Sequence, residues 1–145
     1  MAPRRRCRKT AELFERIFAG VGWIHRGEPI DLTDSDPQPD VTVIPGKFED
    51  YTTHPTTALL VVEVSDTILD FDLTTKAEVY ATATIPDYWV LDVNARRLHV
   101  FRDPAQFPAG LGATAYRTHD VIEATGTVSP LAAPNATVTV AELLP

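Results

Sequence analysis

The sequence has one cysteine, Cys7, and no long apolar segment. A single thiol can build neither a disulfide framework nor a cysteine-based zinc site. Without a run of about 18 apolar residues, the chain predicts no membrane-spanning helix and no membrane partner. The basic stretch MAPRRRCRKT is followed by AELFERIFAG, which carries charges throughout and so lacks the apolar region of a signal peptide. These absences favour a cytoplasmic protein.

Positive charge is also scarce, because 13 Lys and Arg face 20 Asp and Glu, which gives a net charge of -7. This balance argues against a protein that binds nucleic acid tightly through phosphate neutralisation alone. It still allows an enzyme that meets nucleic acid through a local basic patch or a bound metal ion. The basic residues cluster in RRRCRK and ARRLHVFR, and we predict that residues 1–9 form a disordered, solvated arm.

The rest of the chain has the composition of a globular protein, with 44% hydrophobic residues and no internal repeat. Its length predicts one domain with one core, over residues 10–145. We expect a helix over 11–20 capped by Thr10, and a second helix over 72–84 capped by Asp72. Strands are expected at 22–26, 40–44, 58–64, 86–93 and 97–102, with weaker elements at 115–122 and 137–144. This order predicts an α/β (α+β) fold with a mixed sheet flanked by helices.

One carboxylate interrupts the most apolar strand, since ALLVVEV carries Glu63 near its end. Asp40 opens the preceding strand, DVTVI. If the two strands pair antiparallel, the start of one meets the end of the other, and Asp40 and Glu63 become neighbours. Two buried carboxylates repel each other unless a cation joins them. Oxygen ligands select a hard divalent ion, so the pattern indicates Mg²⁺ or Mn²⁺.

Lys76 is placed to complete such a site, because it lies early in the helix that follows the Glu63 strand. Its ammonium could hold an attacking water or offset charge on a phosphoryl group. Tyr80 lies four residues on, on the same helix face, where it could orient Lys76 or fill space. Each residue also has an ordinary explanation: a turn aspartate, an exposed or paired glutamate and a solvated lysine. The four histidines, His25, His54, His99 and His119, lack the spacing of a helical metal site, and we assign them no role.

Four blocks of sequence resemble, in order and spacing, the Uma family of putative restriction endonucleases, within the PD-(D/E)XK nuclease superfamily. The blocks are QPDVTVIPG, LLVVEVSDT, DLTTKAEVYA and IPDYWVLDV, and they cover roughly residues 29–104. Any one block is weak, whereas the ordered set is specific. The resemblance implies a restriction endonuclease-like domain over residues 10–145. It also implies Mg²⁺- or Mn²⁺-dependent hydrolysis of phosphodiester bonds in nucleic acid, with DNA favoured and RNA left open. A homodimer would be the simplest arrangement for cutting both strands.

The resemblance also assigns roles to individual residues. Asp40 matches the aspartate of the PD motif, and Glu63 matches the acid of (D/E)XK. Both would be metal ligands, together with the backbone carbonyl of Val64. The usual lysine position holds Ser65 here, and in this family the lysine is taken to have moved to the following helix, where Lys76 stands. Asp72 also matches the family pattern; we expect a helix cap first and a supporting site residue second.

Two features depart from the family pattern. Members have an N-terminal hairpin and a longer first helix, whereas this chain starts close to that helix, which predicts a shortened N-terminus and reduced or lost activity. Thr84 stands where a glycine commonly precedes the IP pair. A catalytically inactive nuclease-fold interaction module is therefore the alternative to an endonuclease. A solute-binding or regulatory α+β domain would require the four-block match to be chance.

Overall fold

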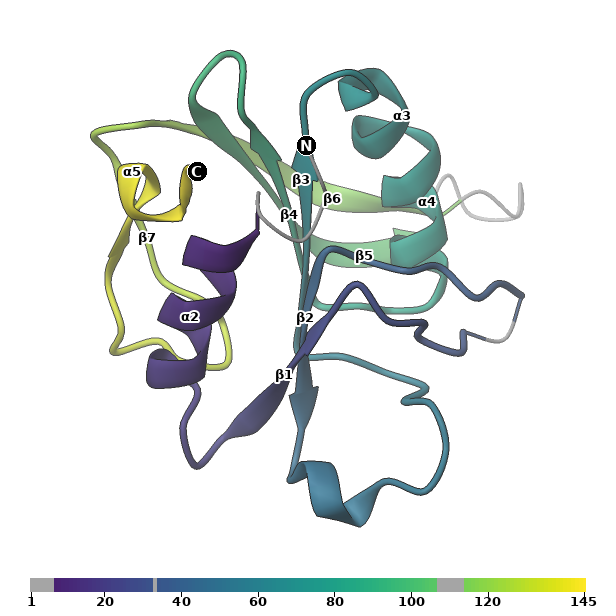
Figure 1. The fold of residues 1–145 in the computed structure, drawn as a ribbon. Helices are drawn as coiled ribbons and strands as arrows, with labels where there is room; N and C mark the ends of the chain where they lie inside the picture. Colours follow the sequence, from purple (N-terminus) through teal and green to yellow (C-terminus); the bar gives the residue numbers. More distant parts are fainter. Residues whose placement is uncertain (1–6, 33, 107–113) are drawn as a thin grey trace.

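A computed structural model describes residues 7–32, 34–106 and 114–145 of the chain. Within them, a six-stranded sheet has the order β1-β2-β3-β4-β5-β6, with β3 and β4 parallel and the other neighbours antiparallel. The strands are β1 (Gly22–Arg26), β2 (Val41–Pro45), β3 (Leu60–Ser65), β4 (Asp87–Asp92), β5 (Arg97–Gln106) and β6 (Thr114–Glu123). Helix α2 (Arg8–Ile17) covers one face, and α3 (Leu69–Leu73) and α4 (Thr75–Thr82) cover the other (Figure 1). The predicted mixed sheet flanked by helices is thus confirmed.

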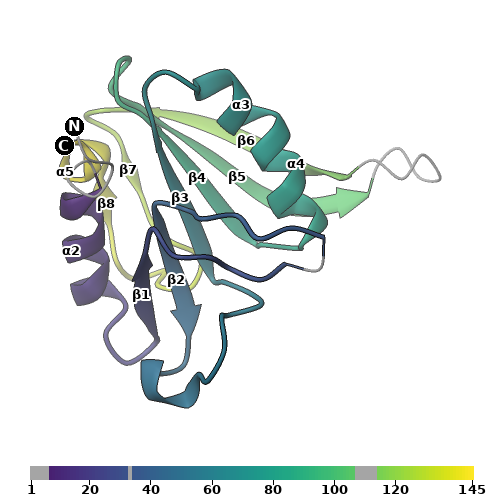
Figure 2. The same ribbon diagram turned by 45° about the vertical axis from the view of Figure 1, so that its right-hand side comes forward.

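Smaller elements complete the described fold. A 3-10 turn, η1 (Phe48–Asp50), lies between β2 and β3, and a two-stranded sheet pairs β7 (Thr127–Val128) with β8 (Val138–Thr139). Helix α5 (Val140–Leu143) follows and lies beside α2, as two views show (Figures 1 and 2). No helix of the described residues is long and apolar enough to cross a membrane.

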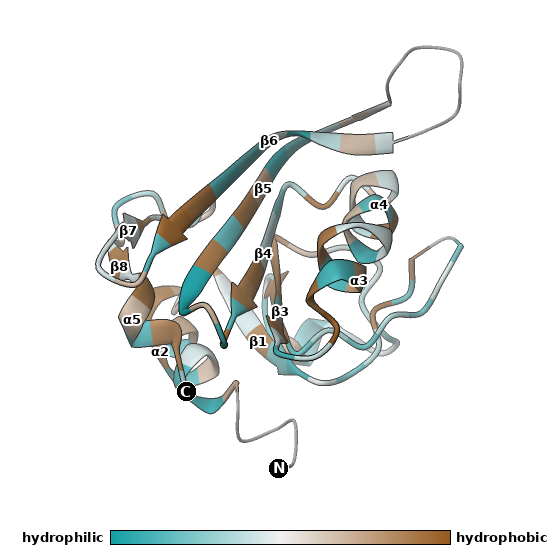
Figure 3. Ribbon diagram, turned by 90° about the horizontal axis from the view of Figure 1, so that it is seen from above, coloured by the Kyte–Doolittle hydropathy of each residue, from teal (hydrophilic) through white to brown (hydrophobic). Residues whose placement is uncertain are grey.

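The sheet separates two hydrophobic clusters because side chains alternate between its faces. Trp89 and Leu91 of β4 face α2, where Phe14 packs edge-on against Trp89 at 5.8 Å between ring centroids. Tyr88 and Val90 face α4. In Figure 3, β3 is mostly hydrophobic, whereas β5 alternates. A central parallel pair buried on both faces needs such near-continuous apolar strands. Tyr88 and Trp89 are core residues, since both side chains are fully buried.

The N-terminal helix begins earlier than predicted. It starts at Arg8, and the buried Cys7 precedes it, so residues 7–9 do not belong to a disordered arm. Residues 1–6 of that arm lie outside the described residues. Thr10 is not the helix cap, because its hydroxyl donates a hydrogen bond to the carbonyl oxygen of Leu143, at 3.0 Å. The assignment of residues 10–145 to one domain stays a prediction.

The second helix is divided. Thr74, with φ -117° and ψ -77°, separates α3 from α4, and Asp72 lies inside α3. The expectation that Asp72 caps a helix over 72–84 is therefore wrong. The carbonyls at the end of α3 have no partner within that helix. The Tyr88 hydroxyl satisfies one of them by donating to the carbonyl oxygen of Asp72, at 2.8 Å.

Candidate active site

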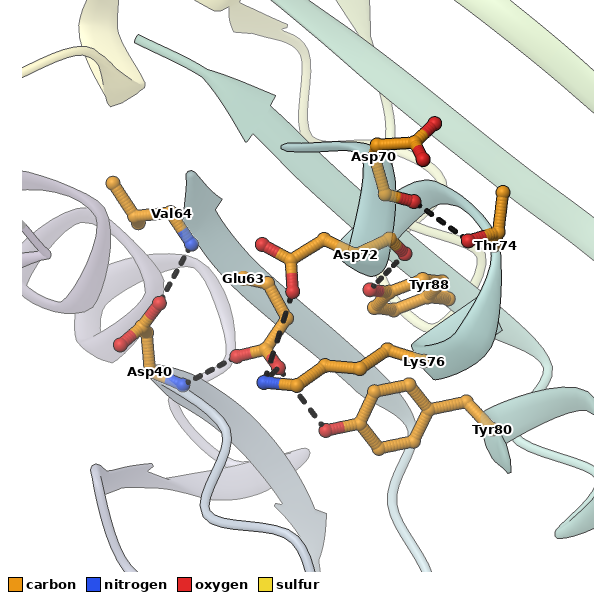
Figure 4. A network of polar contacts seen from close by, with 9 residues as sticks. All are labelled: Asp40, Glu63, Val64, Asp70, Asp72, Thr74, Lys76, Tyr80 and Tyr88. Atoms are coloured by element: carbon orange, nitrogen blue, oxygen red, sulfur yellow. Dashed lines mark hydrogen bonds and ion pairs between the residues drawn. The ribbon is translucent and has the colours of Figure 1, made fainter. Parts of the chain in front are cut away.

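Asp40 and Glu63 lie side by side at one end of the sheet. Val41 pairs with Val62 in the antiparallel β2–β3 ladder. Asp40, just before Val41, therefore lies opposite Glu63, just after Val62. The backbone N–H of Asp40 donates to Oε1 of Glu63 at 3.0 Å (Figure 4). The expected pairing of the two strands, and the resulting closeness of the two carboxylates, are therefore confirmed.

Asp40 also supports the end of β3. That strand continues past Val62, its last residue paired with β2, so Val64 would lack a backbone partner on that side. The backbone N–H of Val64 instead donates to Oδ2 of Asp40 at 2.7 Å. The N–H and C=O of one strand residue point toward the same neighbour. The Val64 carbonyl is therefore directed to the same side as Asp40.

Lys76 reaches this corner from α4. Its ammonium lies 2.5 Å from Oε2 of Glu63 and 3.7 Å from Oδ1 of Asp72 (Figure 4). Tyr80, one helical turn further on, donates its hydroxyl to the same Glu63 oxygen at 3.3 Å. The structure thus gathers Asp72, Lys76 and Tyr80 around Glu63, although a helix break lies between the first two.

Burial dominates the electrostatics of the corner. It raises the pKa of Glu63 from 4.5 to about 7, although the charge of Lys76 acts in the opposite direction. Burial also raises the pKa of Asp72. For Lys76, burial alone would lower the pKa, but the charge of Glu63 and its hydrogen bond outweigh burial and raise it. Three carboxyl groups, those of Asp40, Glu63 and Asp72, therefore share one lysine, and the imbalance favours a further cation.

A cavity of about 260 Å³ opens onto these groups. Asp40, Glu63, Asp72 and Lys76 line it, together with polar residues of the strand ends and with Ile68. Ser65 of β3 is 1% exposed. Among the described residues that line this cavity, Lys76 of α4 is the only one with a cationic side chain.

The donors at the corner fit a hard divalent ion in their chemistry. Two carboxylates and one backbone carbonyl are oxygen ligands, and Mg²⁺ commonly takes one or two carboxylates and fills its other positions with water and phosphate oxygens. Among the residues that the structure describes, no group of three or more His, Cys, Asp or Glu side chains is spaced to hold a metal ion. A metal here would rest on Asp40 and Glu63, and the Lys76 ammonium would have to leave Glu63.

Two buried polar groups outside this corner had no signal in the sequence. Asp87 is fully buried and accepts hydrogen bonds from Trp89 Nε1 at 2.7 Å, from Arg102 Nε at 3.0 Å and from the backbone N–H of Leu131 at 3.0 Å. His99 Nδ1 lies 2.8 Å from Nε2 of His119, across β5 and β6. Apart from Trp89, these partners are distant in the sequence, and the β4–β5 and β5–β6 pairings bring Arg102 to Asp87 and His119 to His99.

Comparison with known proteins adds two findings. The family model Uma2, described as "Putative restriction endonuclease", matches residues 5–141. The crystal structure of a putative nuclease belonging to DUF820, from Anabaena variabilis ATCC 29413, superposes with a TM-score of 0.70. The match covers 94% of this chain and 76% of that one, at 13% sequence identity, so it supports the fold alone. A search of the curated proteins finds no match.

Proposed function

Because the chain belongs to the Uma2 family of putative restriction endonucleases, we propose that it is a metal-dependent endonuclease that hydrolyses phosphodiester bonds of nucleic acid, with DNA as the first substrate to test. The observation that carries the proposal is the convergence of Asp40, Glu63 and Lys76 at one cavity. These residues come from the start of one strand, the end of the next and a helix beyond it. Folding for stability alone does not require three charged groups to meet there.

In the proposed mechanism, Asp40, Glu63 and the Val64 carbonyl hold Mg²⁺ or Mn²⁺. The bound ion would polarise the scissile phosphate and lower the pKa of a water molecule. Lys76 would hold the attacking water and offset the charge that develops on the phosphoryl oxygens. Tyr80 acts through Glu63, because its hydroxyl donates to the carboxylate and so fixes the orientation of that group.

The acidic surroundings shape how a substrate could approach. The net charge is -7, and the cavity is lined by Asp40, Glu63, Asp66 and Asp72 against Lys76 alone. A phosphate entering this cavity without a metal would meet net repulsion. A divalent ion held by Asp40 and Glu63 would therefore offset this repulsion. A homodimer would place two such sites on the two strands of a duplex.

One observation favours the second candidate function, a catalytically inactive interaction module. The acids already have structural partners: Asp40 accepts the Val64 N–H, and Glu63 accepts the Asp40 N–H and pairs with Lys76. A protein of this fold could keep these contacts without cleaving anything.

A cleavage assay separates the two functions. The purified protein is incubated with plasmid, linear and single-stranded DNA and with RNA, each with Mg²⁺, with Mn²⁺ or with EDTA. We expect metal-dependent cleavage that falls at least about 100-fold in Asp40→Asn and in Lys76→Met. Asparagine retains an oxygen that can accept the Val64 N–H, so this variant tests the charge and not the fold. Glu78→Gln, an exposed change on α4, is the matched control. Equal cleavage by all four proteins would refute the endonuclease.

A further inference from the structure

Lys76 lies between two buried carboxylates, and its ammonium is closer to one of them. Its ammonium is 2.5 Å from Glu63 and 3.7 Å from Asp72, and the two acids are 3% and 2% exposed. The lysine side chain itself is 25% exposed, so it borders the cavity and has room to move. In the described structure, the Lys76 ammonium is paired with Glu63.

A divalent ion on Glu63 changes this balance. Lys76 occupies Oε2 of Glu63, while Oε1 accepts the Asp40 N–H. An ion bound to the same carboxylate would lie a few ångströms from the ammonium, and two like charges at that distance repel strongly in a buried site. The lysine must therefore give up Glu63 when the metal binds, and its charge then needs another acceptor.

We infer that Asp72 is this acceptor: it takes over the Lys76 ammonium when Glu63 binds a divalent ion, and so holds the lysine beside the metal. This inference rests on the proposed function and names a positioning residue for it. Asp72 can play this part because its Oδ1 has no close hydrogen-bond partner among the described residues and faces the ammonium at 3.7 Å, although the Ser65 side chain also interacts with this carboxylate. Its main chain is fixed by the Tyr88 hydroxyl, and its Oδ1 already lies 3.7 Å from the Lys76 ammonium across the break at Thr74, so the two stay within reach during the shift.

Two other roles for Asp72 give different results. If Asp72 were a direct metal ligand, its loss would weaken metal binding whether or not the lysine is present. If it only stabilised the fold, its loss would leave metal affinity unchanged. If instead the Lys76 ammonium moves from Glu63 to Asp72, which we call the handover, the effect of losing Asp72 on metal affinity depends on whether Lys76 is present. This dependence can be measured.

The first experiment needs no metal. Glu63→Gln removes the charge that holds Lys76, as a bound ion would. A double-mutant cycle with Asp72→Asn and Lys76→Met is measured by urea denaturation in EDTA, once in the wild-type background and once in the Glu63→Gln background. We expect the coupling between positions 72 and 76, expressed as the non-additive shift of the denaturation midpoint, to be at least twofold larger in the Glu63→Gln background. An equal or smaller coupling would overturn the inference.

The second experiment measures Mn²⁺ binding by calorimetry for the wild type, Asp72→Asn, Lys76→Met and the double variant. Asp72→Asn should raise the Kd about tenfold, because the ammonium then stays on Glu63 and competes with the ion. In the Lys76→Met background the same change should have a several-fold smaller effect. Equal weakening in both backgrounds would identify a ligand or a general charge effect, and no change in either would identify a structural role. Both results contradict the handover.

The two experiments also separate this inference from the proposed function. If no variant binds Mn²⁺ and none cleaves nucleic acid, the metal-dependent endonuclease is refuted, and a metal-driven handover with it. The metal-free cycle still decides whether Asp72 accepts the lysine once Glu63 loses its charge. If Mn²⁺ binds and cleavage occurs but the coupling is the same in both backgrounds, the endonuclease stands and the role of Asp72 is refuted.

Discussion

Replacing Glu63 by glutamine should change how the stability of the metal-free protein depends on pH. Burial raises the pKa of this carboxyl group from 4.5 to about 7 in the folded protein. Below pH 4.5 the group is protonated in both the folded and the unfolded chain. Between pH 4.5 and about 7 the unfolded chain releases this proton while the folded protein retains it. The free energy of unfolding therefore falls as the pH rises through this window.

The size of the effect follows from the shift. One pKa unit corresponds to about 1.4 kcal/mol, so a rise from 4.5 to about 7 means that the Glu63 carboxyl alone contributes about 3 kcal/mol less stability above pH 7 than below pH 4.5. Glutamine does not titrate and lacks this loss. Asp87 also has a raised pKa because of burial, but it lies outside this corner and titrates in both proteins. The difference between the two proteins therefore reports Glu63, together with any change at Asp72, which shares Lys76 with it.

The assay is urea denaturation in EDTA at several pH values across this window. The free energy of unfolding of Glu63→Gln minus that of the wild type should increase by about 3 kcal/mol from the acidic to the neutral end. Glu78→Gln removes an exposed carboxylate of α4 and should follow the wild type throughout. A flat difference, or one that decreases toward neutral pH, would refute the claim that burial outweighs Lys76 at this group.

Three further changes test contacts around the two cores. Tyr80→Phe removes the hydroxyl that donates to Glu63 but keeps the ring, so it should cost about 1 kcal/mol in denaturant melts. Arg102→Met leaves the fully buried Asp87 carboxylate without its ion-pair partner and should cost on the order of 3 kcal/mol near neutral pH, with a smaller loss at acidic pH, where the carboxyl is protonated. Phe14→Ala empties a buried site between α2 and the sheet and should cost about 3–5 kcal/mol, seen as a lower thermal midpoint.

These three variants have a shared control. Arg117→Met removes an exposed cation whose ion pair with Asp103 is 3.8 Å long, and exposed pairs contribute less than about 1 kcal/mol. If Arg102→Met were no more costly than Arg117→Met, the Asp87 carboxylate would not depend on its arginine. If Phe14→Ala left the melting curve unchanged, the packing of α2 on Trp89 would not contribute to stability.

The sheet and the corner that holds Asp40 and Glu63 could be predicted because their signals are local. Runs of β-branched and apolar residues mark β2 and β3, and antiparallel pairing of neighbouring strands then places the two acids together. The position of Lys76 followed from a different constraint. Parallel strands need a crossover, and the helices between β3 and β4 must return over the sheet.

The break in the helix beside Asp72 was not accessible in the same way. The segment DLTTK contains no Gly or Pro, so it predicts an unbroken helix with a capping aspartate. Near the break at Thr74, the hydroxyl of Tyr88, which belongs to β4, donates a hydrogen bond to the carbonyl oxygen of Asp72. Thr10 was misassigned for the same reason, since its partner, Leu143, lies at the other end of the chain. Helix propensity depends on residues that are close in the sequence, whereas the corrections at Asp72 and Thr10 depend on partners that are distant in the sequence.

The hydrogen bond from Val64 to Asp40 has a consequence for how such chains diverge. Asp40 accepts the backbone N–H of Val64 at the edge of β3, so selection for folding alone would keep this acid in a descendant that no longer cuts nucleic acid. Lys76 binds no backbone group through its ammonium among the described residues. In a lineage that loses cleavage, the first substitution should therefore occur at position 76, while Asp40 persists.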